Sequence, residues 1–301
     1  MSYEYTYLTK SPKTGLNRYR RDIPKQLVSI KNTNMWNMQN LRQKTEFDPF
    51  VELINTARIN NQISKKTQRP FSFEKYKLFM ESLEAESIPI IIIGAGGHAV
   101  SVANVALGSG MSVVAFVDDF KAGNDLLGIP VITKKQCVEE NKIANLAIAI
   151  GDNTVRERVS NEYKSELPLA KFPSIIHHSA VIGINSKIGD GTVVMPLVNV
   201  GANCSVSDFC ILNTSSSIDH DCEMKSFSSI APRVITGGNV RIGVRSAISI
   251  GATIRDGIGV GDDTVIGANS YVNRAIGDNL VAYGNPCKSQ RERVKGDAYL
   301  S

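Results

Sequence analysis

Residues 181–200 read VIGINSKIGDGTVVMPLVNV, and this stretch carries the pattern that decides the fold. An aliphatic residue stands at every sixth position. Stepping by six from Ile182 to Val272 meets sixteen positions, and fifteen of them hold an aliphatic residue or Met; the exception is Thr236. An uninterrupted period of six predicts a parallel β-helix, in which each rung makes one short strand and one turn. Three rungs complete a coil, so stacked positions should lie about 18 residues apart.

Small residues precede the aliphatic series by two positions, and glycine often follows it. The small set includes Cys204, Cys210 and Cys222, which we therefore interpret as inward-facing packing residues and not as metal ligands or redox groups. We expect the glycines to relieve the corners between rungs.

Residues 88–172 have a different character. The run IPIIIIGAGG at 88–97 is typical of a buried parallel strand that ends in a glycine loop, and a helical stretch of small residues follows it. Two more strands are predicted at 111–119 and 145–153, which gives a βαβ unit with a small parallel sheet. About 80 residues are too few for a complete two-half dinucleotide fold.

The composition limits the remaining possibilities. No apolar stretch is long enough to cross a bilayer, and five cysteines without a CxxC pair argue against a disulfide framework or zinc ribbon, so we expect a cytoplasmic protein. The net charge of +5 is concentrated in residues 1–88, which hold 15 Lys/Arg against 9 Asp/Glu. Residues 1–45 form a basic arm and 46–87 have helical spacing, so this extension is either a packed appendage or a docking arm for a partner or membrane surface. No nucleic acid partner is expected.

Five segments, taken together, resemble those of a family of bacterial sugar acetyltransferases. They are IIIGAGGHA, FVDD, AIGDN, NTSSSIDHDC and YGNPCK. The family includes the bacillosamine-pathway UDP-4-amino-sugar N-acetyltransferase and the sialic acid O-acetyltransferases, and the likeness covers roughly residues 88–290. The resemblance implies a Rossmann-like α/β domain, then a left-handed parallel β-helix, assembled as a homotrimer with acetyl-CoA between neighbouring β-helices. The predicted domains are an extension at 1–87, a nucleotide-sugar domain at 88–172, an acetyltransferase β-helix at 173–290 and a tail at 291–301.

The resemblance also implies a catalytic set, His220 as general base with Asp221 and Asn213. A neutral imidazole suits proton removal near neutral pH, and a neighbouring carboxylate orients it. The alternative is a turn at residues 219–221 without chemistry. After subtraction of the repeat positions, Asn213, His220 and Asp221 are left as residues that the repeat does not require.

Further sites follow from the resemblance. The amide of Gly238 corresponds to a donor to the acetyl carbonyl, and Ser229 stands where the similar enzymes often carry a second histidine. The other expected cofactor contacts are Ile250, Gly251 and Ala268. The expected nucleotide-sugar contacts are Gly96, Gly97, His98, Asp118, Asp119 and Gly151.

We therefore expect an acetyl-CoA-dependent acetyltransferase that acts on a nucleotide-linked sugar in surface glycan synthesis. The acceptor favoured by the resemblance is the 4-amino group of a UDP-sugar. O-acetylation of sialic acid is the enzymatic alternative, because one base serves an amine or a hydroxyl. A non-catalytic nucleotide-sugar scaffold is the second alternative. A third hypothesis, a β-helix zinc hydratase, lacks support because the four histidines do not form a convincing set of zinc ligands, and no metal is expected.

Overall fold

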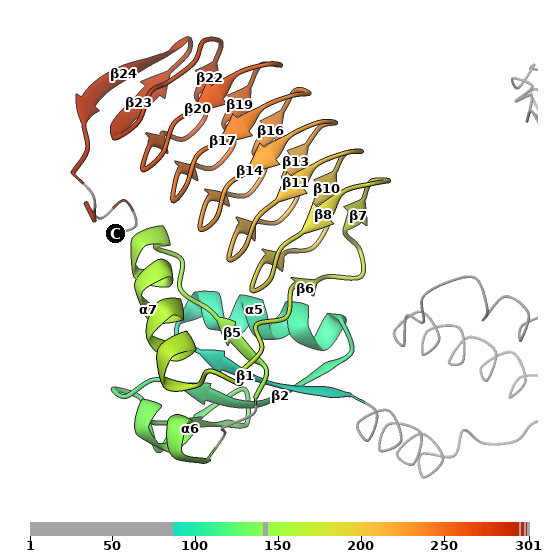
Figure 1. The fold of residues 1–301 in the computed structure, drawn as a ribbon, viewed down its shortest axis with the longest axis vertical. Coiled ribbons are helices and arrows are strands. Elements are labelled where there is room, and N and C mark those ends of the chain that lie inside the picture. Colours follow the sequence, from blue (N-terminus) through green and yellow to red (C-terminus); the bar gives the residue numbers. More distant parts are fainter. Residues whose placement is uncertain (1–86, 141–143, 295, 298, 300–301) are drawn as a thin grey trace, which may run out of the picture. The chain divides into compact units, whose positions relative to one another are not determined.

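The computed structural model describes residues 87–140, 144–294, 296–297 and 299 (Figure 1). The basic arm of residues 1–45 lies outside this part of the chain. So do the helices predicted within 46–87, apart from Ser87 itself.

The first domain is a five-stranded sheet with helical cover, in the order β3-β4-β2-β1-β5. Its strands run parallel except for the β3–β4 pair. The elements in chain order are β1 Ile88–Ile93, α5 Gly97–Gly108, β2 Met111–Val117, β3 Asp125–Leu126, β4 Ile129–Ile132, α6 Lys134–Glu140, β5 Leu146–Ile148 and α7 Asn153–Glu166.

Helix α5 joins this sheet to the second domain. Its buried side chains are all Ala or Val, and these small residues allow close packing on both sides. They form one hydrophobic cluster with Ile90 and Ile92 of β1 and with Ile175, Val193 and Val194 of the first coil. Figure 1 accordingly shows α5 between the sheet and the start of the β-helix.

The second domain is the predicted parallel β-helix. A six-stranded sheet contains β7 Val181–Ile182, β10 Asn199–Val200, β13 Ser217–Ile218, β16 Ile235–Thr236, β19 Thr253–Ile254 and β22 Tyr271–Val272. A five-stranded sheet contains β8 Lys187–Ile188, β11 Ser205–Val206, β14 Glu223–Met224, β17 Arg241–Ile242 and β20 Gly259–Val260. An eight-stranded sheet contains β6 Ile175–Ile176, β9 Val193–Val194, β12 Ile211–Leu212, β15 Ser229–Ile230, β18 Ala247–Ile248, β21 Val265–Ile266, β23 Leu280–Gly284 and β24 Cys287–Glu292.

Strand register confirms the repeat. Asn199 pairs with Val181 on one side and with Ser217 on the other, so each coil advances by 18 residues. The aliphatic series points inward and is buried along most of its length, from Val194 to Val272. The thiols of Cys204, Cys210 and Cys222 are free and buried inside the coils, as packing requires.

The corners differ from the expectation in one respect. The residue three positions after each inward aliphatic residue has a left-handed backbone, at every sixth position from Asn185 to Asn269, with φ between 51° and 70°. Glycines such as Gly183 and Gly201, which directly follow the aliphatic residue, do not supply this turn. A Cβ on Gly183 would lie 2.5 Å from the Gly201 carbonyl carbon, so these glycines allow successive coils to stack closely.

The fold class is thus the predicted one, a Rossmann-like domain followed by a parallel β-helix. The exact division between the domains, at residues 172 and 173, stays a prediction. Within the described part of the chain, no helix is both long and apolar enough to cross a membrane.

Candidate active site

The left-handed residues form three edges along the β-helix, and we name each after one member. The Asp221 edge contains Asn185, Asn203, Asp221, Asn239 and Gly257. The Phe209 edge contains Gly191, Phe209, Phe227, Arg245 and Asp263. The Ser215 edge contains Leu197, Ser215, Arg233, Gly251 and Asn269.

Asp221 therefore occupies a left-handed corner, which the sequence interpretation missed. Its φ is 59°, and Asp and Asn tolerate this conformation better than most residues. The slot itself does not demand Asp or Asn, since Phe209, Arg233 and Gly257 fill equivalent slots, so the interpretation that the repeat does not require Asp221 stays a prediction.

His220 and Asp221 form a hydrogen-bonded pair directly after β13. The imidazole Nδ1 lies 2.7 Å from Asp221 Oδ2, and both side chains are exposed. This hydrogen bond, with the charge of Asp219, raises the pKa of His220 above its ordinary value. The same bond, together with one from Asn203, lowers the pKa of Asp221. An ionised carboxylate on Nδ1 leaves Nε2 as the basic nitrogen of the neutral ring.

Thr236, the exception in the aliphatic series, contacts the residue before this pair. Its Oγ1 accepts a hydrogen bond of 3.2 Å from the backbone N–H of Asp219. Between β13 and β16 only Ser217 and Ile235 pair, whereas the other strand contacts of the sheet pair at two positions. The strand ladder is thus interrupted where the chain leaves it to form the His220 turn.

Gly238 lies one coil beyond His220, directly against the imidazole ring. A Cβ on Gly238 would be 2.6 Å from both Cε1 and Nε2 of His220, so only glycine accommodates the ring in this position. Among the described residues, the Gly238 N–H donates to no protein acceptor. The fold therefore brings together a basic nitrogen and an available backbone donor, the two groups that acyl transfer requires.

Asn213 lies on a different edge from His220. It follows β12 and its Oδ1 accepts a 2.8 Å hydrogen bond from the N–H of Thr214 at the Ser215 edge. The side of the coil that contains β13 separates the two residues. At about 3.3 Å per residue, the distance from Ser215 to His220 is on the order of 15 Å. Within one chain, Asn213 therefore does not lie beside His220 and Asp221.

Ile250, Gly251 and Ala268 stand on the same edge as Asn213, further along the stack. The N–H of Gly251 donates to Pro232 O at 3.0 Å, and the N–H of Asn269 donates to Ile250 O at 2.9 Å. These expected cofactor contacts are thus adjacent to one another but distant from His220 within one chain. Their role in binding stays a prediction.

Ser229 belongs to neither edge. It lies in β15 of the eight-stranded sheet and is half-buried. Burial raises the pKa of Tyr299, and a hydrogen bond with Ser229 opposes that shift, so the two side chains are neighbours. Its surroundings therefore favour a structural role, although its function as a cofactor contact is untested.

The glycine loop before α5 is open to a ligand. Gly94 has a φ of 115°, and a Cβ there would meet Ala149 O at 3.0 Å. Gly96 and Gly97 are exposed, and a Cβ on either would meet no atom of the described residues within 4 Å. Among the residues that the structure describes, Nε2 of His98 is buried and has no hydrogen-bond partner. Burial, with a smaller effect from the charge of Arg156, lowers the pKa of His98 to about 4, so the ring is neutral near pH 7.

Three further expected substrate contacts already have protein partners. Asp118 Oδ1 accepts from the N–H of Phe120 at 3.0 Å, and Asp119 Oδ1 accepts from the N–H of Lys134 at the start of α6 at 2.8 Å. The carbonyl of Gly151 accepts from Arg156 at 3.0 Å and from the Tyr299 hydroxyl at 3.3 Å. The second oxygen of each aspartate leaves room for a substrate contact, which stays a prediction.

Comparison with known proteins shows which proteins this chain is similar to. Residues 89–163 match the family described as the PglD N-terminal domain. GDP-perosamine N-acetyltransferase of Escherichia coli O157:H7 is 30% identical over 149 residues, 48% of this chain and 65% of that protein, slightly under two thirds. A solved histidine-to-alanine variant of GDP-perosamine N-acetyltransferase from Caulobacter crescentus, in complex with CoA and GDP-perosamine, is 30% identical. It matches with a TM-score of 0.65 over 68% of this chain and 97% of that chain.

The acetyltransferase domain of PglB from Neisseria gonorrhoeae, solved in complex with acetyl coenzyme A, is 32% identical. It has a TM-score of 0.64 and covers 68% of this chain and 100% of that chain. The chain belongs to the hexapeptide-repeat sugar acetyltransferases. The expected family is thereby confirmed.

One residue of this acetyltransferase gave no signal in the sequence. Arg156 in α7 is 1% exposed, and its guanidinium donates to the carbonyls of Phe209, Phe227, Ile150 and Gly151 and to Asn153 Oδ1. Burial lowers the pKa of Arg156. Because these acceptors come from both domains, Arg156 fixes the α/β domain of the acetyltransferase against the Phe209 edge.

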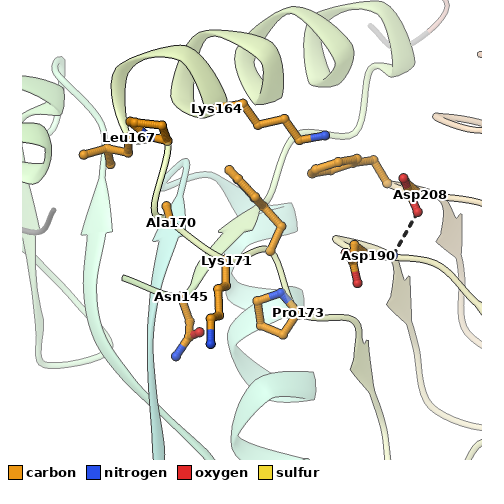
Figure 2. Close-up of a pocket in the computed structure, with 11 residues that line it drawn as sticks. Asn145, Lys164, Leu167, Ala170, Lys171, Pro173, Asp190 and Asp208 are labelled. Carbon is orange, nitrogen blue, oxygen red and sulfur yellow. Dashed lines mark hydrogen bonds between the residues drawn. The ribbon is translucent and has the colours of Figure 1, made fainter. Parts of the chain in front are cut away.

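A cavity of about 530 Å³ adjoins the same edge, lined by Lys164, Lys171, Phe172, Asp190 and Asp208 among others (Figure 2). Figure 2 shows Asp190 and Asp208 joined by a hydrogen bond, in which the N–H of Asp190 donates to Oδ1 of Asp208 at 3.0 Å. None of the expected site residues lines this cavity. Throughout the described ranges, no group of three or more His, Cys, Asp or Glu is placed to hold a metal ion.

Proposed function

We propose that this acetyltransferase transfers an acetyl group from acetyl-CoA to the amino group of a nucleotide-linked sugar, with His220 as general base. The observation that carries the proposal is the His220–Asp221 pair with Nε2 directed at Gly238. The relatives solved with CoA, acetyl coenzyme A and GDP-perosamine support the donor and the class of acceptor.

The reaction follows from the groups that are present. The acceptor nitrogen attacks the thioester carbonyl, and neutral His220 takes its proton at Nε2 while Asp221 stabilises the imidazolium. The Gly238 N–H is suited to donate to the developing oxyanion. As the new N–C bond forms, the C–S bond breaks, and the imidazolium returns its proton to the departing thiolate of CoA. No oxidant or further reactant is required.

The nucleotide of the sugar would bind at the glycine loop. Gly96 and Gly97 leave space for close approach of a phosphate to the N-terminus of α5, where backbone N–H groups favour an anion. Nε2 of His98, which has no partner among the described residues, and the carboxylates of Asp118 and Asp119 would supply polar contacts for the rest of the substrate. A role in surface glycan synthesis belongs to the same proposal.

A second copy of the chain would complete the site. Within residues 173–279, all the exposed large apolar side chains lie on the six-stranded sheet or on its two flanking edges; they are Val181, Ile184, Leu197, Ile235 and Ile250. An exposed apolar face of this kind marks an interface. Packing it against another copy would bring the Ser215 edge, with Asn213, to the Asp221 edge, with His220. We propose a homotrimer that binds acetyl-CoA between these edges.

A cytoplasmic location is part of the proposal. The described chain holds five buried free thiols, which suit a reducing compartment.

The test is an acceptor panel. Purified protein is incubated with acetyl-CoA and UDP-, GDP- and dTDP-linked 4-amino sugars, and with sialic acid as the hydroxyl acceptor, while CoA release and product mass are followed. We expect turnover with at least one nucleotide-linked amino sugar. Transfer to sialic acid alone would establish the O-acetylation alternative, and nucleotide-sugar binding without turnover on any acceptor would establish the scaffold.

A further inference from the structure

We infer that Asn203 is a positioning residue for the reaction, which fixes the Asp221 carboxylate so that Oδ2 faces His220. This inference rests on the proposed function, because His220 must act as the base for Asn203 to matter to catalysis. Asn203 occupies the same corner slot as Asp221, one coil earlier.

Three side chains on the Asp221 edge form a ladder that ends at the imidazole. Nδ2 of Asn185 donates to Oδ1 of Asn203 at 3.3 Å, and Nδ2 of Asn203 donates to Oδ1 of Asp221 at 3.2 Å. Oδ2 of Asp221 then lies 2.7 Å from Nδ1 of His220. The rungs stack at the spacing of hydrogen-bonded strands, about 4.8 Å, which is short enough for amide side chains to meet.

The chemistry of the groups sets the direction of this ladder. An ionised carboxylate only accepts hydrogen bonds, so Asn203 must present its NH₂ group to Asp221. Its carbonyl oxygen then faces the preceding coil, where Asn185 supplies a donor. With Oδ1 held by Asn203, the carboxylate plane is fixed and Oδ2 is left to orient the ring.

The corner conformation alone does not require this arrangement. Gly191 and Gly257 fill equivalent slots with φ of 67° and 68°, without any side chain. Asn239, with φ of 56°, occupies the slot on the other side of Asp221. Its backbone N–H donates to His220 O, and within the described residues its side chain makes no hydrogen bond to Asp221. Asn239 is therefore a matched control for Asn203.

The experiment compares Asn203→Gly with Asn239→Gly in the full chain, since glycine removes the amide and retains the left-handed backbone. For Asn203→Gly we expect kcat to fall roughly threefold to tenfold, the range of one hydrogen bond, with the KM for acetyl-CoA unchanged. Asn239→Gly should stay within about twofold of the parent. In an Asp221→Gly background, Asn203→Gly should have no further effect on kcat, because its target is absent.

A second readout does not depend on turnover. With only four histidines in the chain, selective ¹⁵N labelling allows the His220 ring to be titrated by NMR. The charged groups that act on it are Asp221 and Asp219, and Asp256 from a later coil lies against Gly237. If Asn203 holds Asp221 in place, Asn203→Gly lowers the pKa of His220 part of the way to its value in Asp221→Gly.

An unchanged or raised pKa of His220 in Asn203→Gly would overturn the inference, as would an additive kcat loss in the Asp221→Gly background. A parent protein without turnover on any acceptor would refute the proposed function instead, and the titration would still decide whether Asn203 positions Asp221.

Discussion

Replacement of Gly238 by alanine tests whether catalysis depends on the close approach of the His220 ring to the Gly238 backbone. The added Cβ would lie 2.6 Å from Cε1 and Nε2 of His220 and 3.1 Å from Nδ1. Carbon contacts are normally about 3.5–4.0 Å, so the ring must retreat by about 1 Å. A misplacement of about 1 Å in a reacting group costs on the order of 100-fold in rate. We therefore expect kcat/KM of Gly238→Ala to fall about 100-fold.

Stability should change little in the same variant. The His220 ring is exposed and free to move aside, so we expect the free energy of unfolding to stay within about 0.5 kcal/mol of the parent. Gly259→Ala is the matched control, because a Cβ there meets nothing within 4 Å and its backbone is not left-handed. Steady-state kinetics and urea denaturation of both variants measure the two effects. Activity of Gly238→Ala within threefold of the parent would refute the reasoning.

Three more predictions concern the pair, the domain junction and the assembly. Because Asp221 raises the pKa of His220 and the neutral ring is the base, kcat/KM of the parent should decline as pH falls through a value above 6.5. Asp221→Asn should move this acidic limb to lower pH; an unmoved limb in the pH profile would contradict the pairing. Arg156→Met leaves Phe209 O and Asn153 Oδ1 as buried acceptors without donors, and each should lower the free energy of unfolding by about 1–3 kcal/mol. Urea denaturation should therefore show a loss of about 2–6 kcal/mol, whereas Arg158→Met on the exposed side of α7 should change stability by less than about 1 kcal/mol. Finally, if His220 and Asn213 act from different copies, co-expressed His220→Ala and Asn213→Ala chains should recover about one quarter of parent activity. No recovery in mixed oligomers verified by mass spectrometry would place both residues in one copy's site.

The repeat made most of the fold predictable. An inward residue every six positions leaves little freedom, because each rung must bury one side chain and then turn. The period also carried information about the site that the sequence interpretation did not use. Positions 18 residues apart stack, so Asn213 and His220, seven residues apart, stand on different edges of the coil. Likewise, Thr236 was the exception in the series, and it marks the interrupted ladder beside His220.

Other features were not predictable from local pattern. Arg156 has the sequence context of an ordinary helix residue, and its five acceptors come from α7, the loop before it and two coils of the β-helix. The ladder from Asn185 to Asp221 depends on the left-handed corner, which only the backbone reveals. The contact between Ser229 and Tyr299 depends on where the C-terminal tail returns to the molecule.

The most direct test of the central claim, that His220 is the base for acetyl transfer, is the rate of labelled acetyl transfer by the parent and by His220→Ala. Both proteins are given acetyl-CoA and the best nucleotide-linked amino sugar at saturating concentrations, and the acetylated product is quantified by mass. We expect kcat to fall by about 100-fold to 10,000-fold with the oligomeric state unchanged, the range for loss of a general base. A His220→Ala protein that transfers acetyl at the parent rate would contradict the account.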